Sequence, residues 1–167
     1  MAWQLPAAAD LDAVAGADLL TTLLAEGRRS RLVARLREDL RLVESIDLEI
    51  HALEAGSFAL LEAVCDPADL DAVGTAIAQV WQELMQEPIG QAEWQRAQRL
   101  VANGYRFGLE AAGGVAGLIG SNGLWDRPRA LAAPLEMLEQ WSPEALHAQL
   151  LPLLNPALAC QLEAIPA

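Results

Sequence analysis

The spacing of apolar side chains changes near residue 45, and this change restricts the folds that the chain can adopt. From Leu11 to Leu24 apolar residues recur at helical intervals, and Gly27 is placed to end that helix in the left-handed conformation. From Ile46 to Ile50 they alternate with polar residues, which is typical of a strand with one face in water. The chain must therefore combine helices with a half-exposed sheet.

Each of these two segments is followed by a second element of the same kind. Ser30 is expected to cap a second helix, and Gly56 with Ser57 separates the strand from an apolar run over residues 58–65. The two extended runs predict an antiparallel hairpin. The inward stripe of the second helix is expected to consist of Leu32, Val33, Leu36 and Leu40.

The remaining elements follow from start and stop signals. Asp66-Pro67 predicts a helix that runs to about Gln86, and a further helix carries Trp94 to Tyr105. The glycine-rich stretch 113–123 predicts close helix packing or a bend. The last helix is expected to start at Ser142, and strands are expected over residues 2–5 and 157–165, with Cys160 in the core of the latter. This order predicts an α+β fold of two layers, with an antiparallel or mixed sheet covered by helices.

Composition excludes several classes of function. The 167 residues suit a single domain, and their net charge of −12, with no lysine at all, argues against nucleic acid as a partner. The one basic run, Arg28 to Arg41, alternates with leucine and is typical of a solvated helix face. We find no apolar segment long enough for a membrane span, and no signal peptide. With Cys65 and Cys160 isolated in the sequence, we expect a reducing, cytoplasmic location.

No motif supplies a self-sufficient catalytic centre. His51 and Glu54 have H-x-x-E spacing, but they follow an alternating strand, whereas metal ligation at this spacing needs a helix. His147 is interpreted as a partly exposed helical residue. The glycine-rich stretch has no preceding strand and no Gly-Lys-Ser/Thr, so it is no phosphate loop. We therefore expect the chain to work as part of a larger assembly.

One segment resembles a known family. Residues 23–40, LLAEGRRSRLVARLREDL, are similar to the helix, glycine turn and Ser-Arg-Leu helix of the pitrilysin/insulinase metallopeptidases, which include the mitochondrial processing peptidases. The opening strand, the strand pair, the Asp66-Pro67 helix and the segment QAEWQRA at 91–97 agree with that family's layout. The resemblance runs nearly from end to end.

The resemblance implies a non-catalytic role. Family members are zinc peptidases or their inactive partners, in which repeated α+β domains close around an unfolded peptide, and zinc is held by an H-x-x-E-H helix that this chain lacks. We therefore expect residues 1–167 to be one C-terminal domain half, with a segment missing before Met1. No cofactor is expected in this chain. Its expected partners are a zinc-carrying catalytic domain or subunit and an unfolded peptide.

The resemblance also implies a substrate-binding residue. Arg37 occupies the position of a family arginine that reaches the substrate at the zinc site of the partner, where a cation stabilises negative charge on the scissile carbonyl. The accompanying tyrosine position holds Glu44, and the usual glycine before it is replaced by Arg41. A plain helix-surface role for Arg37, paired with an acid, stays open. So do two other functions for the chain, a stand-alone domain that dimerises through its opening strand and an independent small-molecule enzyme.

Overall fold

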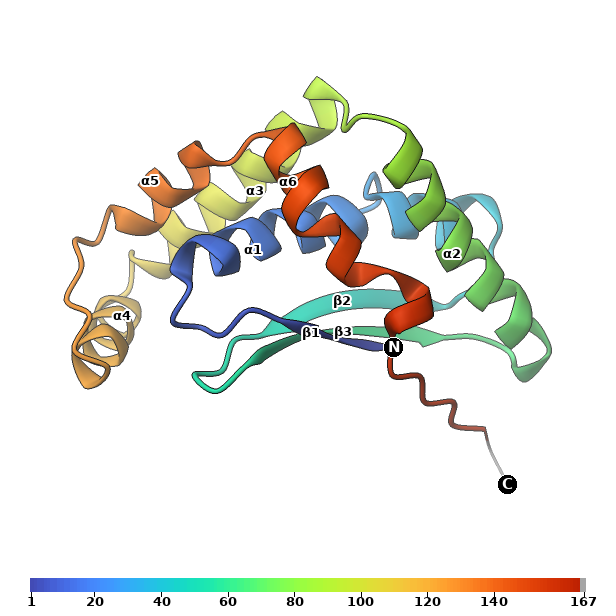
Figure 1. Cartoon of the computed structure of the whole chain (residues 1–167), viewed down its shortest axis with the longest axis horizontal. Helices are drawn as coiled ribbons and strands as arrows, with labels where there is room; N and C mark the ends of the chain where they lie inside the picture. The colour runs from blue at the N-terminus through green and yellow to red at the C-terminus, as the bar shows by residue number, and fades with distance from the viewer. Residues whose placement is uncertain (166–167) are drawn as a thin grey trace.

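Three strands form one antiparallel sheet, and helices cover a single face of it (Figure 1). The computed structural model describes residues 1–165. The strands are β1 (Ala2–Leu5), β2 (Ser45–His51) and β3 (Ser57–Val64), and β3 lies between the other two. This arrangement confirms the α+β fold class, with a sheet that is antiparallel throughout.

The alternation along the strands separates a buried face from an exposed one. Trp3, Leu48 and Leu61 are each less than a tenth exposed and belong to the core beneath the helices. Burying a side chain of this size stabilises the fold by about 1.5–3 kcal/mol. Asp47 and Glu62, which face each other across β2 and β3, lie on the exposed side. The half-exposed hairpin predicted from the sequence is confirmed.

Helix α1 (Leu11–Ala25) packs between the sheet and the outer helices (Figure 1). The carboxylate of Asp10 caps its first turn by accepting the N–H of Ala13 at 3.0 Å. The helix ends at Ala25 with Glu26 as its C-cap, and Gly27 has a φ of 78°, so the predicted left-handed residue after this helix is confirmed.

The segment after Ser30 forms the π-helix η1 (Val33–Asp39) where the sequence predicted an ordinary α-helix. Its N–H groups bond five residues back, as in the 3.0 Å bond from Leu40 N to Arg35 O. Leu36 is buried as expected, but Leu40 is 47% exposed, so its assignment to the inward stripe was wrong. The wider turn rotates Leu40 out of the stripe that a 3.6-residue period would produce.

The predicted start of the third helical segment is confirmed. The carboxylate of Asp66 accepts the N–H of Ala68 at 2.9 Å, and the 3-10 turn η2 (Pro67–Asp69) leads into α2 (Leu70–Gln86). Helix α3 (Gln91–Gly108) follows after a short break.

The hydroxyl of Ser142 caps α6 (Pro143–Gln149), again as predicted, by accepting the N–H of Ala145 at 3.1 Å. The preceding helix α5 (Ala133–Gln140) was not predicted, because its eight residues hold only a short apolar pattern.

The glycine-rich stretch is itself a helix, α4 (Ala112–Leu124), and it stands at one end of the molecule, away from α2 (Figure 1). None of its residues is buried. No charged residue occurs from Ala111 to Trp125, and Ile119 and Leu124 are 55% and 78% exposed. Within residues 1–165 no helix has the length and the apolar character needed to cross a membrane.

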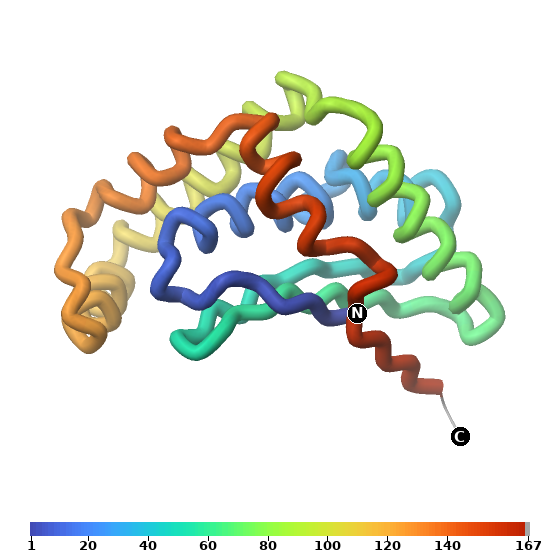
Figure 2. The backbone as a smooth tube through the Cα atoms, in the orientation of Figure 1, coloured from blue at the N-terminus to red at the C-terminus, as the bar shows by residue number. Residues whose placement is uncertain are grey.

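The predicted strand over residues 157–165 was wrong. The 3-10 turn η3 (Leu151–Leu154) precedes it, and a second 3-10 turn, η4 (Pro156–Leu158), occupies its beginning. Only Cys160 pairs with the sheet, through one antiparallel bridge to Ala2. The chain then leaves the sheet next to the N-terminus (Figure 2). Cys160 is exposed and not part of the core. The side chain of Asn155 caps η4, and this local turn overrides the alternating pattern that follows it.

Candidate functional site

Four arginines of the basic run pair with carboxylates, namely Arg28, Arg31, Arg35 and Arg37. Arg31 makes a two-pronged contact with Glu93 on α3, at 2.9 and 2.7 Å, and the pair is about three-quarters withdrawn from solvent. Hydrogen bonding to Arg31 and to the N–H of Gly90 lowers the pKa of Glu93, although burial of this carboxyl opposes the shift and is the largest single effect. The pair therefore joins the segment just before η1 to α3.

Arg37, the predicted substrate-binding residue, lies on η1 with its side chain 39% exposed. Its guanidinium donates to Glu38 at 3.1 and 3.0 Å, and Glu38 also accepts from Arg28. The hydrogen bonds from Arg28 and Arg37 lower the pKa of Glu38. Arg37 is thus paired with an acid on its own helix, and its side chain is partly exposed to solvent.

The two positions that depart from the family pattern lie just after η1. Arg41 is exposed and has a φ of 55°, in the left-handed region that favours glycine. Glu44 is exposed as well, and its N–H donates to the carbonyl of Val64 at 2.7 Å. The backbone has therefore kept a glycine-like turn although the residue there is an arginine.

The histidine and cysteine candidates are not brought together. His51 ends β2 and stacks on Phe58, with ring centroids 4.5 Å apart, while Glu54 is held by Arg127 through bonds of 3.0 and 2.6 Å. His147 lies on α6. Across the part of the chain that the structure describes, no three His, Cys, Asp or Glu side chains are grouped to hold a metal ion. Zinc does not fit these residues.

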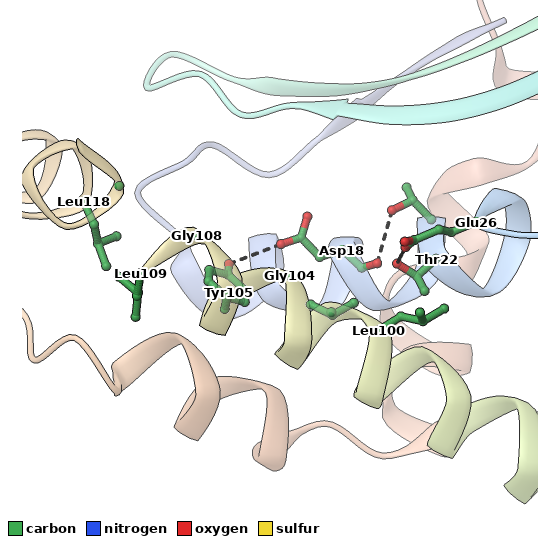
Figure 3. Close-up of a pocket in the computed structure, with 12 residues that line it drawn as sticks. Asp18, Thr22, Glu26, Leu100, Gly104, Tyr105, Gly108, Leu109 and Leu118 are labelled. Atoms are coloured by element: carbon green, nitrogen blue, oxygen red, sulfur yellow. Dashed lines mark hydrogen bonds between the residues drawn. The ribbon is translucent and has the colours of Figure 1, made fainter. Parts of the chain in front are cut away.

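A groove of about 590 Å³ lies between α1, α3 and α4. This volume is typical of sites for small ligands or for single side chains of a partner. Asp18 and Tyr105 lie at its middle, Glu26 and Thr22 lie at one end, and Leu118 of α4 lies at the other (Figure 3). We refer to it as the α4 groove.

Asp18 is the most perturbed acid beside the groove. Burial raises its pKa to about 6, the nearby charge of Glu26 acts in the same direction, and a 3.3 Å hydrogen bond from the Tyr105 hydroxyl opposes both. Burial and the charge of Asp18 raise the pKa of Tyr105 in turn, so the phenol stays protonated and donates. Glu26 accepts a 2.8 Å bond from the hydroxyl of Thr22.

Glycines shape the walls of the groove. Gly114, in the first turn of α4, lies directly against the carbonyl oxygen of Gly108, where a Cβ would collide with backbone. This contact brings α4 to the end of α3. Gly104 and Gly108 are one helical turn apart and have no atom within 4 Å of the place of a Cβ. Their bare backbone leaves the groove open along α3.

Sequence reasoning missed this groove. It placed Tyr105 on a helix, without a role in a site, and did not consider Asp18. A signal was present, because Asp18 is the one charged residue between Ala13 and Ala25, a stretch that otherwise forms the buried part of α1. An isolated acid among buried apolar residues has a shifted pKa, and shifted pKa values cluster at functional sites.

A family model described as the peptidase M16 inactive domain matches residues 1–101. A search of curated proteins found no match. Among solved structures, a protease from Helicobacter pylori is 25% identical, with a TM-score of 0.76, over 87% of this chain and 35% of its own.

Two further structures share the fold at lower identity. The peptidase M16 inactive domain from Pseudomonas fluorescens is 19% identical over 93% of this chain and 37% of its own, with a TM-score of 0.80. The inactive peptidase domain of a predicted zinc protease from Bordetella parapertussis is 18% identical over 87% and 78%, with a TM-score of 0.76. The chain covers little more than a third of the Helicobacter and Pseudomonas chains.

Proposed function

The chain belongs to the family of peptidase M16 inactive domains, and from this membership we propose that it is the non-catalytic half of a zinc peptidase. In this role it completes the chamber that holds an unfolded peptide, while an H-x-x-E-H half elsewhere binds zinc and cleaves. The family match over residues 1–101 carries the proposal, and it confirms the resemblance to the pitrilysin/insulinase family.

The length of the related chains also supports the proposal. The similar chains from Helicobacter and Pseudomonas are nearly three times as long as the part that this chain matches, so they have room for a second half.

A reconstitution experiment tests the proposal. The chain is mixed with an H-x-x-E-H half of an M16 peptidase, and cleavage of a quenched fluorescent peptide is measured. We expect cleavage by the mixture, none by the chain alone, and none when the glutamate of the H-x-x-E-H motif is changed to glutamine. Metal analysis of the purified chain should find no stoichiometric zinc. Cleavage by the chain alone, or an H-x-x-E-H half that gains nothing from it, would contradict the proposal.

We propose a substrate contact for Arg37 within the same role. Its guanidinium would leave Glu38 and stabilise negative charge on the scissile carbonyl in the partner's site. In the reconstituted mixture, Arg37→Lys and Arg37→Ala should lower kcat without weakening assembly of the two halves. The matched control is Arg28→Ala, which removes the other arginine bound to Glu38. Equal effects of Arg28→Ala and Arg37→Ala would show that Arg37 acts only through Glu38.

The alternative function is a stand-alone domain that dimerises through its opening strand. It is favoured by the position of β1 at the edge of the sheet. Within the described residues, the outer side of β1 pairs with the chain only through a single bridge to Cys160. Light scattering after gel filtration separates the two functions. A stable dimer that Gln4→Pro dissociates, together with no effect on any peptidase, would favour the alternative.

A further inference from the structure

The α4 groove contains two carboxylates that form no ion pair with a described residue. Asp18 and Glu26 are the charged residues among those that line it, and neither forms an ion pair with any described residue. The carboxylate of Asp18 accepts a hydrogen bond from the hydroxyl of Tyr105, and that of Glu26 accepts one from the hydroxyl of Thr22. A carboxylate withdrawn from water normally has a charged partner, because hydroxyl donors compensate only part of the lost hydration.

The rest of the groove is apolar and open. Leu109 and Leu118 lie at the α4 end, and Leu100 lies beside the line that joins Tyr105 to Glu26 (Figure 3). The bare backbone at Gly104 and Gly108 leaves space between these apolar residues and Asp18. The groove therefore has space for an alkyl chain of a few methylene groups, with two carboxylates near the end of that chain.

We propose that the α4 groove is a binding site for an aliphatic cation, that is, an ammonium or guanidinium group on a linear hydrocarbon chain. The alkyl part lies between Leu118 and the glycine backbone of α3, and the cation lies between Asp18 and Glu26. Both a free alkylamine and the lysine or arginine side chain of a bound peptide have this chemistry. The inference concerns the helical layer alone and does not depend on the proposed peptidase role.

The charges around the groove argue against an anion and against a metal ion. An anion would face Asp18 and Glu26 with no compensating cation among the lining residues. A metal ion would find no third ligand, since the described residues hold no group of three. Arg96 stands at the Glu26 end, but its guanidinium donates to the backbone carbonyls of Glu26 and Thr22 and leaves both carboxylates unpaired.

Titration with hexylamine, followed by amide chemical shifts, is the direct test. We expect shifts confined to α1, α3 and α4, and at least about tenfold weaker binding of 1-hexanol, which has the same chain without the charge. Asp18→Asn keeps the shape of the site and should weaken hexylamine binding by at least about tenfold, with a smaller loss for Glu26→Gln. Gly104→Leu should abolish binding by filling the groove, whereas Gly104→Ala should leave most of it.

Binding should also depend on pH. The groups that face the cation are Asp18 and Glu26 of α1 and Tyr105 of α3, with Arg96 beyond Glu26 and no charged residue on α4. Because Asp18 must be ionised, affinity for hexylamine should rise by up to about tenfold per pH unit below pH 6 and level off above it. In Asp18→Asn this rise should disappear.

A second arm distinguishes the two sources of the cation. A capped, glycine-flanked peptide with a central lysine is compared with the same peptide carrying norleucine. If the lysine peptide binds and the norleucine peptide does not, the groove takes the side chain of a polypeptide; if only hexylamine binds, it takes a free amine. Equal binding of hexylamine and hexanol, or no shifts in α1, α3 and α4 with any cation, would overturn the inference.

Discussion

At the scale of single residues, the environment of Asp18 works against the folded state at neutral pH. Its pKa rises from 3.8 to about 6 on folding, so the folded chain binds a proton at this carboxyl more tightly than the unfolded chain does. The stability that this group contributes is complete below pH 3.8 and is lost as the pH rises through about 6. The cation site proposed for the α4 groove would explain why an acid occupies this position despite its cost.

Asp18→Asn should therefore stabilise the protein at neutral pH. The change should raise the free energy of unfolding by up to about 3 kcal/mol at pH 7 and have little effect near pH 4, because asparagine removes the cost of ionisation. Urea denaturation at pH 4 to 8 measures the difference. Asp47→Asn on the exposed face of β2 is the control and should stay within about 0.5 kcal/mol throughout. A difference that does not change with pH would contradict this account.

Arg41 is a second residue whose conformation predicts a stabilising change. Its left-handed backbone, with φ at 55°, costs a non-glycine residue about 1–2 kcal/mol, and the flexibility of glycine in the unfolded chain offsets about half of that. Arg41→Gly should raise the free energy of unfolding by about 0.5–1 kcal/mol, measured by thermal and urea denaturation. Arg41→Ala removes the same charge but keeps the strain. If both variants gain equally, the charge and not the backbone was the cause.

At the scale of elements, a glycine on α1 allows the C-terminal helices to approach. A Cβ on Gly16 would lie 2.5 Å from the ring of Trp141 and 2.6 Å from Leu150 Cδ1. Trp141 is also fixed by its Nε1, which donates to the carbonyl of Asp12 at 2.9 Å. The ring therefore fits into a notch that only glycine provides.

Gly16→Ala should destabilise the fold by about 1–3 kcal/mol, although alanine favours a helix, because Trp141 and Leu150 must move. The matched control is Gly74→Ala on α2, where the space around the Cβ is empty. That change should stabilise the fold by up to about 1 kcal/mol. Both values come from urea denaturation followed by tryptophan fluorescence. A stabilising Gly16→Ala would show that the notch closes without cost.

Elements with local signals could be predicted from the sequence, and elements that depend on distant contacts could not. The β2–β3 hairpin and the start of α2 followed from alternation and from Asp66-Pro67, which act within a few residues. Residues 157–165 alternate as well, but the sheet offers them only one bridge, at Ala2. The π-helix of η1 was missed for a different reason, since the spacing of apolar residues does not distinguish it from an α-helix. The α4 groove needs three helices to meet, which no single segment encodes.

At the scale of the whole molecule, stability is distributed unevenly. The core lies between the sheet and the covering helices, and α4 contributes no buried residue to it. Contacts at both ends hold the α4 segment, namely the backbone contact of Gly114 with Gly108 at its start and the bond pair from Arg127 to Glu54 after its end. A helix held mainly at its ends opens without unfolding the rest.

Hydrogen exchange should reveal this difference between α4 and the core helices. We expect amides of residues 112–124 to exchange at least about 100-fold faster than those in the middle of α1, because opening α4 exposes no core. Arg127→Gln removes one of the two end contacts and should accelerate exchange in α4 further, leaving α1 unchanged. Hexylamine should slow exchange in α4 if the α4 groove binds it, and 1-hexanol should not. Protection of α4 equal to that of α1 would mean that α4 opens only with global unfolding, and the groove would then be a rigid part of the fold.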